Sequence, residues 1–175
     1  MKFSAILTSI AMAAALLAGA HGVVLAQTKE TAKSDATILE MSDAFKKGDR
    51  KRLATLLPQA RGNALEPWAA YWELRARLES APHQEIVDFL QRYAGTYQED
   101  RMRNDWLLML GQVRDWATFT TEYPKFRMND DRSIRCYALL TDFNASGADV
   151  AAQVQDSWLS LKDADDGCAL RQISN

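Results

Sequence analysis

The chain from residue 35 to residue 161 is a series of short segments in which apolar residues recur every three or four positions. The clearest case is the segment that carries Trp68, Tyr71, Trp72 and Leu78. This spacing places the apolar side chains on one face of a helix. No segment alternates apolar and polar residues over a sustained length, as a half-buried strand does. The sequence therefore predicts an all-α protein.

Glycine and proline residues separate the segments, and polar residues suited to helix capping precede several of them. Asp49 is a predicted cap, and Thr96 with Glu99 forms a predicted capping box. We interpret Gly111 as a helix stop. The eight predicted helices cover residues 35–47, 49–57, 66–79, 82–93, 96–110, 116–123, 134–143 and 150–161, with 125–130 as a loop.

Short connections between these helices predict antiparallel neighbours. Helices of this length are unstable alone and must bury their apolar stripes against one another. Pairs that stack sideways would form an α-superhelix, or solenoid, with a concave face, and a compact bundle is the alternative. No clean fixed-period repeat is present. The Trp and Tyr stripes are predicted to be core residues, although such rings can also serve as sugar-stacking platforms.

The amino terminus has the layout of a secretory signal. Lys2 precedes an apolar stretch, and Val24 and Ala26 are small residues before an expected cleavage site at Gln27. A membrane anchor is the alternative, but the many Ala and Gly residues make the stretch weakly apolar for a span of ~20 residues. We therefore predict a signal peptide over 1–26, a polar lead-in over 27–34, and a periplasmic helical domain over 35–175.

Removal of residues 1–26 would change the net charge from −2 to −3. This mildly acidic balance argues against nucleic acid and acidic lipids as partners, because both require a basic surface. The export signal is the only predicted contact with a membrane. His83 would be the one remaining histidine, and we interpret it as a solvated residue or a contact at a helix start.

The two cysteines, Cys136 and Cys168, predict one disulfide in an exported protein. Closing a loop of this size would contribute ~3–4 kcal/mol in the chain-entropy description. A redox pair would have closer spacing, and a zinc site would need about four ligands. The sequence therefore predicts neither a metal site nor a cofactor.

No group of residues in the sequence forms a catalytic constellation. A nucleophilic triad needs a base, usually histidine, and His83 is assigned above to solvent or to a helix start. No glycine-rich phosphate loop is present. The acidic pairs at 130–131 and 165–166 could contribute to a calcium site, but a calcium loop needs more oxygen ligands, so turn and cap roles are favoured. A set of arginines could either line a groove for an anionic polymer or lie on solvated faces: Arg75, Arg77, Arg92, Arg101, Arg103 and Arg114.

Several strings resemble the amino-terminal region of soluble lytic murein transglycosylases. LEPWAAYWELRARL (65–78) resembles an early helix of that family, and residues 87–124, with Trp106-Leu107 and Asp115-Trp116, are similar to the helices that follow. CYALLTDFNASG (136–147) and SWLSLKDADDGC (157–168) resemble the last matching stretch. The resemblance covers residues 38 to 168 and implies part of a U-shaped α-superhelical domain.

The resemblance also implies a function in cell-wall turnover. That family cleaves the β-1,4 bond between N-acetylmuramic acid and N-acetylglucosamine in peptidoglycan and forms a 1,6-anhydro sugar without adding water. A separate carboxy-terminal lysozyme-like domain carries one catalytic glutamate that acts as acid and then base. The implied partner is the glycan strand, bound through the full-length family protein.

The family's catalytic glutamate has no counterpart in this sequence. Its motif is Glu-Ser followed by Gly-Leu-Met-Gln, whereas Glu79-Ser80 precedes Ala81-Pro82. We therefore expect Glu79 to be a helix end, and we expect a non-catalytic chain that stops before the catalytic domain as a truncated or frameshifted copy. A periplasmic helical-repeat adaptor for a protein or peptide is the alternative function, and a complete small enzyme is the least favoured.

Overall fold

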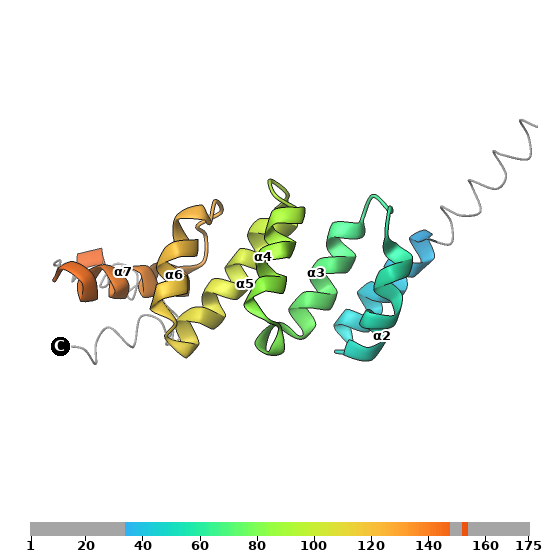
Figure 1. Cartoon of the computed structure of the whole chain (residues 1–175), viewed down its shortest axis with the longest axis horizontal. Coiled ribbons are helices and arrows are strands. Elements are labelled where there is room, and N and C mark those ends of the chain that lie inside the picture. The colour runs from blue at the N-terminus through green and yellow to red at the C-terminus, as the bar shows by residue number, and fades with distance from the viewer. Residues whose placement is uncertain (1–33, 148–151, 154–175) are drawn as a thin grey trace, which may run out of the picture. The chain divides into compact units, whose positions relative to one another are not determined.

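The computed structural model describes residues 34–147 and 152–153, and no strand occurs in this part of the chain. The prediction of an all-α protein is confirmed for these residues. A first helix over 34–46 is followed by the labelled helices of Figure 1. These are α2 (Arg50–Leu56), α3 (Glu66–Ala76), α4 (His83–Arg92), α5 (Tyr97–Val113), α6 (Trp116–Glu122) and α7 (Arg132–Ser146).

The predicted signal peptide, most of the lead-in, Cys168 and most of the predicted last helix lie outside the described residues. Residues 152 and 153, within that predicted helix, are helical. The chain divides into two compact units, residues 1–73 and 74–175. We call them the first unit and the second unit and describe each by itself.

In the first unit, the helix over 34–46 turns into α2 within a few residues. Gly48 adopts a left-handed conformation with φ of +69°, which glycine reaches without the steric cost that a Cβ imposes. The Asp49 carboxylate then accepts a hydrogen bond of 2.9 Å from the Arg52 amide. This contact confirms the predicted cap. Apolar residues of both helices are buried, including Met41 and Leu53.

An aromatic cluster forms the rest of the first unit's apolar packing. Phe45 stacks on Trp72 with 6.3 Å between ring centroids, and Trp72 stacks on Trp68 at 5.9 Å. Tyr71 is buried and meets Trp68 edge to face. The prediction that this stripe is core is thus confirmed for Tyr71, whereas Trp68 and Trp72 are half-buried and contact neighbouring rings.

In the second unit, α5 is the helix against which α4, α6 and α7 pack (Figure 1). Its residues Trp106, Leu107 and Leu110 are buried, as are Ile86 and Phe89 of α4. A helix covered by several neighbours has little surface left for solvent. As a result, nearly all residues of α5 from Glu99 to Leu107 are buried, including charged ones.

The prediction that Gly111 ends a helix is wrong. Helix α5 continues to Val113, and Arg114 ends it in the left-handed region with φ of +63°. Gly111 instead lies beneath the ring of Tyr137 on α7, where an added Cβ would come within 2.3 Å of the Tyr137 Cδ2 atom. The glycine is therefore a point of close helix approach, and its lack of a side chain lets α7 pack against α5.

Prolines end the α-helices as predicted, but the chain continues as a tighter helical turn at two of them. Leu57–Ala60 and Tyr123–Lys125 form 3-10 turns that hold Pro58 and Pro124 near their start. Proline has no amide hydrogen to donate and its fixed φ is helical, so it fits the first position of such a turn. The predicted helix over 66–79 likewise ends earlier, at Ala76, and a 3-10 turn over Leu78–Ser80 follows.

Cys136 lies within α7 and is fully buried. Its predicted disulfide with Cys168 stays a prediction, because Cys168 lies outside the described residues. We expect the protein, when it is prepared from an oxidising compartment, to show no free thiol on denaturation without a reductant, and two after reduction. A labelling reagent followed by mass measurement would count them, and two free thiols without reductant would contradict the pairing.

Candidate functional site

The most unusual chemical feature of the described chain is a group of buried polar residues on α5. Glu99, Asp100, Arg103, Asn104 and Asp105 are all buried. Charged side chains are rarely buried unless they are paired, because removing a charge from water is costly. This group is therefore the best candidate for a functional site, and its contacts decide what it can do.

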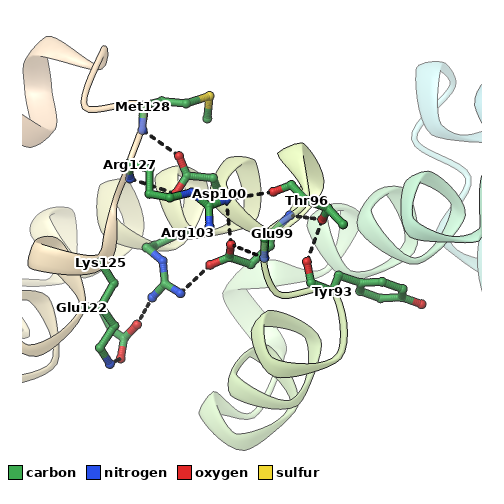
Figure 2. Close-up of polar contacts among 10 residues, drawn as sticks. Tyr93, Thr96, Glu99, Asp100, Arg103, Glu122, Lys125, Arg127 and Met128 are labelled. Carbon is green, nitrogen blue, oxygen red and sulfur yellow. Dashed lines mark hydrogen bonds and ion pairs between the residues drawn. The ribbon is translucent and has the colours of Figure 1, made fainter.

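Arg103 lies between two carboxylates that come from different helices (Figure 2). Its Nη2 atom is 2.6 Å from Oε1 of Glu99, one turn earlier on α5. Its Nη1 atom forms an ion pair with Glu122 at the end of α6. Glu122 also accepts a hydrogen bond of 2.6 Å from Lys125. We call Glu99, Arg103, Glu122 and Lys125 the α5–α6 clamp, because its contacts join the two helices.

Asp100 holds the loop that precedes α7 (Figure 2). Its two carboxylate oxygens accept hydrogen bonds from the backbone amides of Arg127 and Met128, at 3.0 and 2.7 Å. Arg127 in turn reaches back to Glu99, with 2.9 Å between the charged atoms, and to the Thr96 carbonyl at 3.0 Å. With an exposed fraction of only 1%, Asp100 is a fixed internal partner for backbone groups that would otherwise be unsatisfied.

The third buried carboxylate of α5 faces the end of α3. The Oδ2 atom of Asp105 is 3.0 Å from Nε of Arg75, whose side chain is partly exposed. This ion pair ties the last turn of α3 to α5 in the second unit. Every buried carboxylate described here thus has a cationic or amide partner supplied by a neighbouring part of the same unit.

These contacts suit a structural role better than a catalytic one. A general acid or base must come within hydrogen-bond reach of a substrate proton. Glu99 and Glu122 are buried, and their oxygens contact cations or amides of the same chain. Because the oxygens of both carboxylates contact groups of the same chain, the arrangement fixes the geometry of α5, α6 and the following loop.

The sequence predicts part of this arrangement. Thr96 caps α5 as expected, with its hydroxyl accepting from the Glu99 amide at 3.1 Å. The reciprocal contact differs from the predicted capping box, because Glu99 accepts from the amide of Gly95, at 3.3 Å. The pairing of Arg103 with Glu99 follows from their spacing of four residues. No local signal indicates Glu122, which only the packing of α6 brings to Arg103.

His83 lies at the first position of α4 and is exposed, and its ring meets the buried ring of Trp106 edge to face, with 5.6 Å between the ring centroids. The predicted helix-start contact is therefore confirmed. The ring also lies near Asp115, the residue that caps α6. Glu79 is exposed in the middle of the 3-10 turn that follows α3, so it lies just past the α-helix that it was expected to end.

Asp115 provides a pH-dependent contribution to stability. Hydrogen bonds from the Thr118 hydroxyl and amide, at 2.7 and 3.1 Å, hold the pKa of Asp115 below its ordinary value. A lowered folded-state pKa stabilises the protein above the unfolded-state pKa, and this contribution is lost as the pH falls through the folded-state value. We expect Asp115→Ala to cost about 1 kcal/mol at pH 7.

The difference between wild type and Asp115→Ala should shrink as the pH falls from about 4 through the lower folded-state pKa, because the carboxylate of Asp115 then becomes protonated. Urea unfolding of both proteins at pH 7 and at acidic pH would test this. A stability difference that stays constant over that range would contradict the proposed role of the carboxylate.

Several of the arginines that could have lined a groove are engaged in internal contacts. Arg103 and Arg75 pair with buried carboxylates as described, and Arg77 donates to both oxygens of Glu85 at 2.7 and 2.5 Å. Arg92 lies over the ring of Tyr93, 5.5 Å from its centroid, and Arg114 ends α5. These contacts favour structural roles over a shared anion-binding groove.

One member of the acidic pair at 130–131 has a structural role. Asp131 caps α7 and accepts from the Ile134 amide at 3.3 Å, which confirms the favoured interpretation, while the pair at 165–166 lies outside the described residues. Within residues 34–147 and 152–153, no three His, Cys, Asp or Glu side chains are placed to hold a metal ion.

In the same ranges, no helix combines the length and the apolar character that crossing a bilayer requires. No family model, curated protein or solved structure matches the chain.

Proposed function

We propose that this chain is a scaffold segment of a periplasmic lytic transglycosylase, and that it forms part of an α-superhelix beside a peptidoglycan strand. The proposal starts from the resemblance of the sequence strings. It is supported by where those strings fall: 65–78 covers α3, 87–124 covers most of α4 together with α5 and α6, and 136–147 lies on α7. These three strings thus fall on helices, as the proposal requires, while the string at 157–168 lies outside the described residues.

The packing of the aromatic residues is the second support. The most deeply buried rings, those of Trp106, Phe119 and Tyr137, fill the spaces between helices of the second unit. Large rings between short helices are expected where each helix is stabilised mainly by its neighbours. Helices packed in this way hold their positions relative to one another within the second unit, which is the property that a scaffold for a polymer needs.

The buried ion pairs support a non-catalytic role for this segment. The α5–α6 clamp and the Asp100 contacts use the carboxylates of α5 to hold helices and a loop in place. Under this proposal the bond cleavage belongs to a lysozyme-like domain of the family's kind, and the present segment contributes shape and contact with the glycan strand.

Two measurements test the proposal. The full chain should co-sediment with purified peptidoglycan sacculi and should release no 1,6-anhydro muropeptides from them, as measured by mass spectrometry. The coding sequence after Asn175 should contain a lysozyme-like domain in one reading frame. A chain that stays in the supernatant would contradict the glycan contact, and a protein partner captured in its place would favour the adaptor function.

A further inference from the structure

A strongly basic surface lies at the turn between the first helix and α2. Residues 46–52 (KKGDRKR) hold five cations and one acidic residue, in a chain whose total charge is −2. All five cations are exposed. We call Lys46, Lys47, Arg50, Lys51 and Arg52 the basic tip. The charge of the whole chain hides this local excess, because acidic residues elsewhere offset it.

Only two of the five cations have an acidic partner in the described part of the chain. Lys46 is 3.4 Å from Asp43, and Arg52 pairs with Glu40. Lys47, Arg50 and Lys51 form no ion pair with any described residue. These three neighbouring cations are therefore exposed and have no carboxylate partner among residues 34–147 and 152–153.

Helix stability does not account for this placement. Arg50 and Lys51 occupy the first turn of α2, which holds no acidic residue. Exposed backbone amides already concentrate positive charge at that end of a helix, so acidic residues would be favoured there. The turn itself is well ordered, since the Gly48 and Asp49 amides donate to the carbonyls of Phe45 and Ala44 at 3.0 and 2.9 Å. The cations thus extend from a turn that backbone hydrogen bonds hold in place.

The chemistry around the tip indicates the kind of partner. Surfaces that insert into a bilayer combine cations with exposed apolar or aromatic residues. Here the large apolar residues next to the turn and within α2 face inward, although Leu39, farther along the first helix, is exposed: Leu53 and Leu56 are buried, and Phe45 packs on Tyr71 and Trp72. A tip that offers charge without apolar contacts fits a hydrated polyanion better than a bilayer.

We propose that the basic tip binds the carboxylates of peptidoglycan stem peptides and so forms a contact between this chain and the cell wall. This inference rests on the proposed function and names the part of the surface that meets the polymer. The binding is electrostatic, so it weakens as salt screens the charges.

The test compares Arg50→Glu/Lys51→Glu with Arg61→Glu/Arg114→Glu. Both variants change the net charge by the same amount, and all four replaced side chains are exposed. Co-sedimentation with sacculi at low salt would measure affinity, and circular dichroism would check folding. We expect the tip variant to bind about tenfold more weakly and the control to bind like wild type. Converting the sacculus carboxylates to amides should weaken wild-type binding to the same degree.

The outcomes separate this inference from the proposed function. Wild-type binding that both variants retain, or lose equally, would overturn the role of the basic tip while leaving the glycan contact standing. A wild-type chain that does not sediment with sacculi would overturn both proposals. Binding to phosphatidylglycerol vesicles that is lost in the tip variant, with unchanged binding to sacculi, would assign the tip to a lipid surface and overturn the inference.

Discussion

Replacing Gly111 with alanine is expected to lower the free energy of unfolding by about 1–3 kcal/mol. The new Cβ would lie 2.3 to 2.7 Å from three carbon atoms of the Tyr137 ring. The ring has little room to move, because it is 1% exposed and lies 5.9 and 6.1 Å from the rings of Trp116 and Phe119. Either α7 shifts away from α5 or the ring leaves its preferred rotamer.

The sign of this effect distinguishes steric contact from helix propensity. In the middle of an unobstructed helix, alanine is more stable than glycine by about 0.5–1 kcal/mol. At Gly111 the steric overlap with Tyr137 and the higher helix propensity of alanine have opposite effects on stability. Because the overlap is so close, we expect it to outweigh the gain in helix propensity. Urea or thermal unfolding of the two proteins would measure the result.

A matched background gives the control. In a Tyr137→Ala protein the ring is absent, so Gly111→Ala should be neutral or stabilising by up to about 1 kcal/mol. The same destabilisation in both backgrounds would show that Tyr137 is not the obstacle. A stabilising effect in the wild-type background would contradict the close approach of α5 and α7.

Replacing Arg103 with methionine is expected to cost about 3–5 kcal/mol. Methionine has a similar length and fills much of the same space, so the main change is the loss of the positive charge. The buried negative charges of Glu99 and Glu122 would then lose one of their cationic partners, although Arg127 and Lys125 still contact them. Urea unfolding at neutral pH would give the change in free energy.

The partly exposed ion pair of Arg77 and Glu85 provides the comparison. Their side chains are partly solvent-accessible, and the hydrogen bond from Arg77 holds the pKa of Glu85 below its ordinary value. Exposed pairs typically contribute about 0–1 kcal/mol, so Arg77→Met should have a much smaller effect than Arg103→Met. Equal losses of unfolding free energy in the two variants would show that burial does not increase the contribution of the α5–α6 clamp to stability.

A double replacement tests whether the clamp acts as a pair across α5 and α6. Once Arg103 is methionine, Glu122→Gln should cost less than it does in wild type, and can be stabilising, because it removes a buried charge that has lost a partner. The difference between the two backgrounds is the coupling energy of the ion pair. Strictly additive effects would contradict the contact between Arg103 and Glu122.

The sequence alone determined the class of fold and the position of most helices in the described chain. Helical spacing of apolar residues identified the segments, and Asp49, Thr96 and Asp131 act where they were expected. These features are local, because a cap or a stripe depends on residues within one or two turns. The 3-10 turns at Pro58 and Pro124 differ from expectation only in how the chain continues past a helix end.

The tertiary structure decided which residues are constrained by packing. In the sequence Gly111 has the appearance of a helix stop, and Glu122 that of a surface residue near the end of a short helix. Their roles come from Tyr137, 26 positions away, and from Arg103, 19 positions away. Sequence periodicity shows which face of a helix is buried but not which residue of another helix lies opposite it. Which residues meet across two helices depends on how the helices pack against one another, and local sequence patterns do not encode this.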